Sequence, residues 1–140
     1  MKRHIIPHSG GRVKEYTLAA AQTFKSGALV LMDANEDVAT CGADPTSVLG
    51  VSASPAAAEP EPGRVLVNLG SEEALFWADG DNAPTKADIN QQYGAAVDGD
   101  GIWHVDGTET TAKVFYVVDV DLDTNRYLVR ILAAVRQSAP

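Results

Sequence analysis

Few side chains in this chain can form covalent cross-links or bind metal ions. Cys41 is the only cysteine, so no disulfide can form within the chain and packing must hold the fold together. We expect Cys41 to be a small buried apolar group. The three histidines, His4, His8 and His104, have none of the spacings typical of zinc sites. His4 and His8 lie one helical turn apart, but Pro7 disfavours a helix there, so no metal site is predicted.

Long apolar runs and motifs of catalysis are also missing. No apolar run approaches the roughly 18 residues of a membrane-spanning helix, and the N-terminus lacks the apolar core of a secretory signal. We therefore expect synthesis and folding in a cytoplasm, with no membrane partner. Neither a phosphate-binding glycine loop nor a nucleophile elbow occurs. The sequence therefore predicts no enzyme activity and no cofactor.

Basic residues are scarce outside the N-terminal segment. The chain has 19 acidic and 11 basic residues, a formal net charge of -8. Such a body repels nucleic acid, so we expect no nucleic-acid partner, and its charge favours solubility. No acidic residue precedes Glu15, although several basic residues do.

This charge asymmetry suggests that residues 1–14 form an N-terminal arm and residues 15–140 a single domain. The arm would contact a partner through basic and apolar residues: Lys2, Arg3, Ile5, Ile6, Arg12 and Lys14. Two other interpretations remain open. The segment could be a mobile terminus, or a first strand with its charges in solvent.

Short apolar runs separated by turn residues fill most of the chain. Ala28–Met32 is a continuous apolar run, too short for a helix and typical of a strand buried on both faces. Asp and Asn residues in 33–37 predict a reversal. The strongest hairpin pattern pairs residues 113–122 with residues 126–135. Further strands are expected at 12–20, 38–41, 48–51, 64–69, 74–78 and 102–105.

Together these runs give about eight to ten strands, which predicts an all-β fold, either a small antiparallel β-barrel or a β-sandwich. One short helix is expected over Lys86–Tyr93, with Thr85 and Asp88 as a capping box and Gly94 at its C-terminal end. Residues 54–63 carry three prolines and predict a projecting, extended loop.

Two groups of acidic residues allow a calcium-binding alternative. Alternate positions of 119–125 resemble the start of a calcium loop, but Thr124 and Arg130 stand where that loop needs glycine and glutamate. A strand with its acids in water explains this pattern better. The Asp-Gly turns at 79–81 and 98–101 could form a site if they meet in space, although such turns are common without metal.

The aromatic residues allow a sugar-binding alternative. Trp77, Tyr93 and Trp103 could line a platform for a carbohydrate, but scattered aromatics in a β-domain are more often part of the core. We expect one of Phe76 and Trp77 to be buried and the other to lie on a contact surface. Trp77 and Trp103 are the possible surface aromatics.

The run KSGALVLMD at 25–33, the later VLGVSAS at 48–54 and the strand RYLVRIL at 126–132 resemble small head-decoration, or cement, proteins of tailed bacteriophages. The resemblance covers about residues 24–53 and 127–132. It implies a non-enzymatic β-barrel protein on the outside of the virion capsid. Its partner would be the major capsid protein, which it would stabilise, commonly as a homotrimer. The alternative is a calcium-dependent or carbohydrate-binding β-domain on a virion or cell surface.

Overall fold

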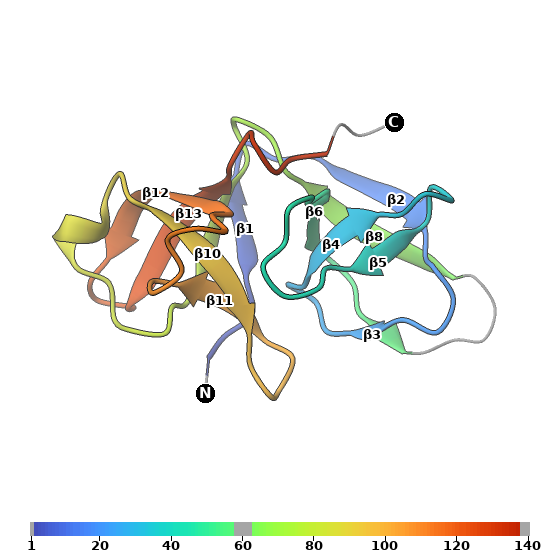
Figure 1. Cartoon of the computed structure of the whole chain (residues 1–140), viewed down its shortest axis with the longest axis horizontal. Coiled ribbons are helices and arrows are strands. Elements are labelled where there is room, and N and C mark those ends of the chain that lie inside the picture. Colours follow the sequence, from blue (N-terminus) through green and yellow to red (C-terminus); the bar gives the residue numbers. More distant parts are fainter. Residues whose placement is uncertain (1, 58–62, 138–140) are drawn as a thin grey trace.

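The computed structural model describes residues 2–57 and 63–137, and shows an all-β protein built from two antiparallel sheets that lie side by side (Figure 1). The predicted all-β class is confirmed in its sandwich-like form, because the sheets do not close into a barrel. The first sheet has six strands in the order β1 (Ile6–Ser9), β9 (Leu75–Ala78), β13 (Arg126–Ile131), β12 (Phe115–Asp121), β10 (Gln92–Val97) and β11 (Trp103–Asp106).

The second sheet has five strands in the order β2 (Val13–Thr17), β8 (Arg64–Leu69), β6 (Gly50–Ser52), β4 (Leu29–Met32) and β5 (Val38–Thr40). A separate pair joins β3 (Thr23–Phe24) to β7 (Ala56–Ala57). Both large sheets curl, since single bridges link Leu18 to Val38 and Gly80 to Val105.

The central strand of the second sheet forms where the apolar run predicted it. Leu29 and Val30 are fully buried, as expected for a strand covered on both faces. Asp33 then turns the chain, because its Oδ1 accepts hydrogen bonds from the amides of Asn35 (2.9 Å) and Asp37 (3.0 Å). This is the local side-chain bonding that makes Asp favourable in reversals.

The predicted hairpin is confirmed as β12 and β13, which pair from Phe115↔Ile131 to Asp121↔Arg126. At its tip Asp121 Oδ1 accepts the amides of Asp123 (3.0 Å) and Thr124 (3.2 Å). The Asp121 carboxylate therefore serves the turn, which agrees with the reading of this segment as a strand and turn.

The helix prediction is wrong over most of its length. Only a single 3-10 turn forms, η1 (Lys86–Asp88), and the chain enters β10 at Gln92. The capping interaction is present, because the Thr85 amide donates to Asp88 Oδ2 at 2.8 Å. Asn90 then adopts a left-handed φ of 70° and its amide bonds to Val117 O. Pairing with the β12 backbone ends the helix before its second turn can form.

The N-terminal segment belongs to the sheets. β1 pairs with β9, and β2 pairs with β8. Ile5 is 2% exposed and belongs to the core, whereas its neighbour Ile6 is 45% exposed. Residues 2–14 thus do not extend from the domain as an arm. β1 and β2 are edge strands, as the alternative of a first strand expected, but Arg3 is paired with Asp79 and does not point free into solvent.

One apolar core joins the two sheets, with Phe76 and Phe115 among its largest fully buried side chains. The C-terminal segment also connects them, because the Val48 amide donates to Val135 O (2.7 Å) and Gln137 bonds to the backbone of Met32. The chain is therefore held to the five-stranded sheet as far as Gln137. The predicted loop at 54–63 contains β7, and its residues 58–62 lie outside the described part.

Among the described residues, no helix has the length and apolar character needed to cross a membrane.

Candidate functional site

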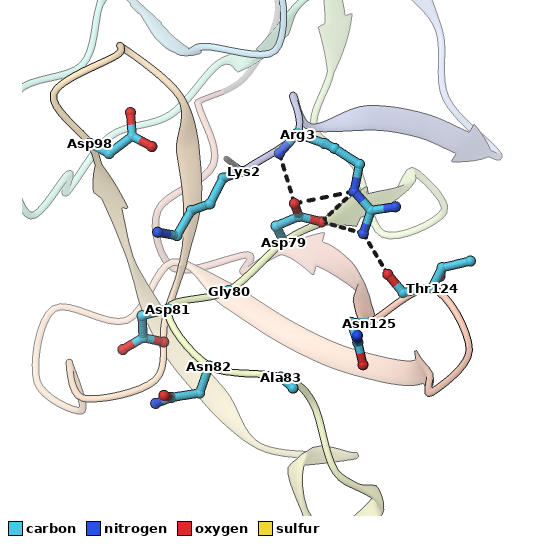
Figure 2. Close-up of a pocket in the computed structure, with 10 residues that line it drawn as sticks. All are labelled: Lys2, Arg3, Asp79, Gly80, Asp81, Asn82, Ala83, Asp98, Thr124 and Asn125. Carbon is cyan, nitrogen blue, oxygen red and sulfur yellow. Dashed lines mark hydrogen bonds and ion pairs between the residues drawn. The ribbon is translucent and has the colours of Figure 1, made fainter.

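Two hollows on the surface are candidates for a functional site. The first is a polar pocket of roughly 570 Å³ where the N-terminal residues meet the end of β9 and the β12–β13 turn (Figure 2). Its lining carries charges of both signs: Lys2, Arg3, Asp79, Asp81 and Asp98.

Asp79 is the centre of this pocket and is nearly buried. Its Oδ2 accepts a hydrogen bond from the Arg3 amide (2.7 Å), and its Oδ1 accepts one from Arg3 Nη2 (2.9 Å). Arg126 Nε forms an ion pair with the same Oδ1 at 3.1 Å. Arg3 also donates to Thr124 O, and Arg126 donates to His4 O at 2.7 Å. Figure 2 shows the Arg3 contacts. These bonds fasten the N-terminus to β9 and β13.

The electrostatics of the pocket are those of a closed ion-pair network. Burial by itself raises the pKa of Asp79, but the hydrogen bonds from Arg3 and the charges of Arg126 and Arg3 outweigh it, so the pKa lies below its ordinary value. The carboxylate therefore stays ionised and paired. This arrangement suits a structural fastening rather than proton transfer.

The two Asp-Gly turns do border this same pocket, as the calcium alternative requires. Their carboxylates are, however, engaged by the backbone. Asp81 Oδ1 accepts the Gly107 amide (3.0 Å), and Asp98 Oδ1 accepts the amides of Asp100 (2.9 Å) and Ile102 (3.0 Å). In the described part of the chain, no three His, Cys, Asp or Glu side chains are placed to hold a metal ion together.

The second hollow is an apolar groove between the two sheets. It consists of two adjoining pockets of roughly 420 Å³ and 250 Å³ that share Pro7 and Asn68. The larger is walled by residues 4–7 on one side and by Ser52, Ala53 and Asn68 of the second sheet on the other. We call this hollow the β1 groove.

Exposed apolar side chains surround the β1 groove. Ile6 lines its larger half and Val13 its smaller half. Leu66 lies on the same face of β8 as Asn68, and its backbone bonds to Ala53 at the groove wall. Val13 is 57% and Leu66 41% exposed. These three are among the few large apolar side chains on the described surface, and together they mark a contact area.

Asn68 is the polar feature of the β1 groove. Its residue is only 6% exposed, and its backbone is occupied by the pairing of β8 with β2 and β6. Within residues 2–57 and 63–137, its side-chain amide has no hydrogen-bond partner. The amide atoms are not fully closed to solvent, so the amide opens to the groove, where a ligand can supply its hydrogen-bond partner.

The residues predicted as arm contacts are placed by the structure in different surroundings. Lys2 and Arg3 border the polar pocket, and Ile6 lines the β1 groove. Ile5 is in the core and unable to reach a partner. The two remaining residues are exposed around β2: Arg12, and Lys14, which lies 5.5 Å from the centre of the Tyr16 ring.

The two residues predicted as surface aromatics differ in their exposure. Trp103 is 3% exposed and belongs to the core, so its prediction as a surface aromatic is wrong. β11 is buried at Trp103, His104 and Val105, so Trp103 lies inside the fold although its cross-strand partner Val97 is 46% exposed. Trp77 stays partly exposed, and its Nε1 donates to His8 Nδ1 at 3.1 Å. Phe76 is buried, so the prediction that one member of this pair is buried is confirmed.

Sequence reasoning missed Asn68, Val13 and Leu66. Asn68 is the single polar residue within Val65–Leu69, and that interruption of an apolar run was the available signal.

This chain matches no protein-family model and no curated protein.

Proposed function

We propose that this protein is a structural component of a tailed-phage virion, which binds the outer surface of the assembled capsid and stabilises it. The strand and turn patterns of residues 24–53 and 127–132, which resemble head-decoration proteins, support the proposal. Its partner is the major capsid protein, and the bound form is a homotrimer on the shell.

The observation that carries the proposal is the set of exposed apolar side chains around the β1 groove. Ile6, Val13 and Leu66 are held on strands of two sheets that share one core, so they form a fixed surface. A rigid body with a preformed apolar contact area is suited to binding another protein.

Such binding would stabilise a shell by mass action. A ligand that binds only the assembled, expanded state shifts the equilibrium toward that state in proportion to its concentration and affinity. The net charge of -8 keeps the free protein soluble at the high concentration that such binding requires.

The test is co-sedimentation of the purified protein with shells built from the capsid protein of the same phage genome. We expect binding to expanded shells, little binding to free capsid subunits, and a higher disassembly temperature for decorated shells. Equal binding to free subunits, or none to expanded shells, would contradict the proposal.

A calcium-binding role is the second candidate, because both Asp-Gly turns border the polar pocket. Repeating the sedimentation with calcium and with a chelator separates the two candidates. If the protein binds the capsid by apolar contact, the amount that sediments with the shells is expected to be the same with calcium and with the chelator.

A further inference from the structure

The strand that borders the β1 groove has an unpaired edge. β1 stands at the end of the six-stranded sheet and pairs only with β9, and its four residues are all exposed. Pro7 lies in its middle, a residue that edge strands tolerate because it lacks an amide donor. An edge presents unpaired backbone groups to which another extended chain can add, and at Pro7 the group that β1 offers is the carbonyl alone.

The opposite wall of the groove offers a matching group. The Asn68 side-chain amide carries two N–H donors and one carbonyl acceptor, so it can bond to both groups of a peptide unit. The residue is 6% exposed, and within the described residues its side chain makes no hydrogen bond. A hydrocarbon ligand would leave this amide unsatisfied. The main chain of a peptide would satisfy it while also pairing with β1.

The charge of the lining restricts the side chains of the occupant. Among the described residues, the lining of the two pockets includes no Asp, Glu, Lys or Arg, and its titratable members are His4 and His8. Gly27 lines the larger pocket, where a Cβ would lie 2.8 Å from Ile5 O. A groove of this lining, with Ile6 and Val13 exposed along it, fits apolar side chains.

We propose that the β1 groove receives an extended, uncharged apolar segment of the capsid protein, which adds as a strand to β1 and hydrogen-bonds to the Asn68 amide. This inference depends on the proposed function and specifies how the partner is held. In this arrangement the capsid segment binds in the β1 groove, so the contact is made by the folded domain of this protein.

The first experiment places a negative charge at the groove and at matched positions away from it. Ile6→Glu and Val13→Glu change exposed residues that line the groove. Val97→Glu and Leu122→Glu make the same change at residues that line neither pocket and are 46% and 49% exposed. We expect the groove variants to bind expanded shells at least about tenfold more weakly, and the controls to bind like the unchanged protein.

The second experiment tests the amide. Asn68→Leu removes the hydrogen-bonding group and keeps an apolar side chain of similar size. We expect its melting temperature to be equal or higher, because an unpartnered buried amide is lost, while shell binding weakens by about tenfold. Hydrogen exchange of residues 4–9 should also slow when the protein binds shells, with the exposed turn at 98–101 unchanged.

The outcomes separate the two proposals. If the unchanged protein does not bind expanded shells, the proposed function fails and the groove inference fails with it. If it binds and the groove variants bind equally well, only the groove inference is overturned. If Val13→Glu instead converts an oligomer of the free protein into monomers, the occupant is a second copy of this chain, and the capsid segment is excluded.

Discussion

At the scale of single residues, Asp79 holds the N-terminus to the fold through two arginines. Asp79→Asn removes the charge that compensates Arg126, whose side chain is only 9% exposed. We expect the variant to lose about 3 kcal/mol of unfolding free energy, because an unpaired buried charge is strongly destabilising. Asp100→Asn makes the same charge change at an exposed turn and should cost less than about 0.5 kcal/mol. Denaturant unfolding of both variants measures the difference, and equal losses would contradict this role.

Asp79 also makes the stability of the folded protein depend on pH, in a direction that follows from its lowered pKa. The folded pKa of Asp79 is lowered, whereas the unfolded value is about 3.9. Its stabilising contribution is therefore complete above the unfolded value and is lost as the pH falls through the folded one. The difference in melting temperature between the unchanged protein and Asp79→Asn should shrink from pH 6 to pH 3. A constant difference would show that the ionised carboxylate is not the cause.

Single residues also show what sequence patterns can and cannot predict. Strand alternation predicted that one of Phe76 and Trp77 is buried, but not which one. It did not predict the burial of Trp103, because β11 is buried at three successive residues, from Trp103 to Val105. Asn68 looked like an ordinary polar residue at a strand end. Its isolation arises only when β1, which lies about 60 residues earlier in the chain, covers it.

At the scale of elements, β1 is part of the folded body, and two adjacent residues test this. Ile5→Ala should destabilise the protein by about 3 kcal/mol, since it leaves a cavity in the core. Ile6→Ala removes the same atoms from an exposed position and should change stability by less than about 0.5 kcal/mol. Thermal unfolding of the pair measures this contrast. Similar small effects would mean that residues 2–9 form a detachable arm.

The elements that were predicted well are those whose signal is local. The strand at β4 and the β12–β13 hairpin each followed from a compact apolar run and an adjacent Asp-containing turn. The helix over 86–93 failed because its second turn competes with backbone pairing to β12, a partner more than 20 residues away in the sequence. Non-local pairing leaves no trace in the local pattern.

At the scale of the whole molecule, the shared core and the docked C-terminal segment should make the two sheets unfold together. Trp77 and Trp103 report on the six-stranded sheet. Cys41 reports on the other sheet, where burial raises the pKa of its thiol to about 12 and keeps it unreactive. We expect tryptophan fluorescence and a brief pulse of thiol labelling to give the same denaturant midpoint.

A Cys41→Ala variant gives the labelling background for that experiment. In the native state, labelling should be slower by roughly a thousandfold than in the unfolded state, as follows from a thiol pKa raised by about three units. Labelling that begins well before the fluorescence change would show that the five-stranded sheet opens independently.

The sequence was sufficient for the all-β class at this scale but not for the division into two sheets. The six-stranded sheet joins β1 to strands of the C-terminal half of the chain, and no composition change marks where one sheet ends.

The chain passes from one sheet to the other between β1 and β2, returns between β8 and β9, and reaches back again through Gln137. Residues 1–70 therefore hold the whole five-stranded sheet together with one strand, β1, of the six-stranded sheet. Recombination at the β8–β9 connection would give one product an orphan strand and leave the other without its edge. We therefore expect the two sheets to be inherited, duplicated or replaced together.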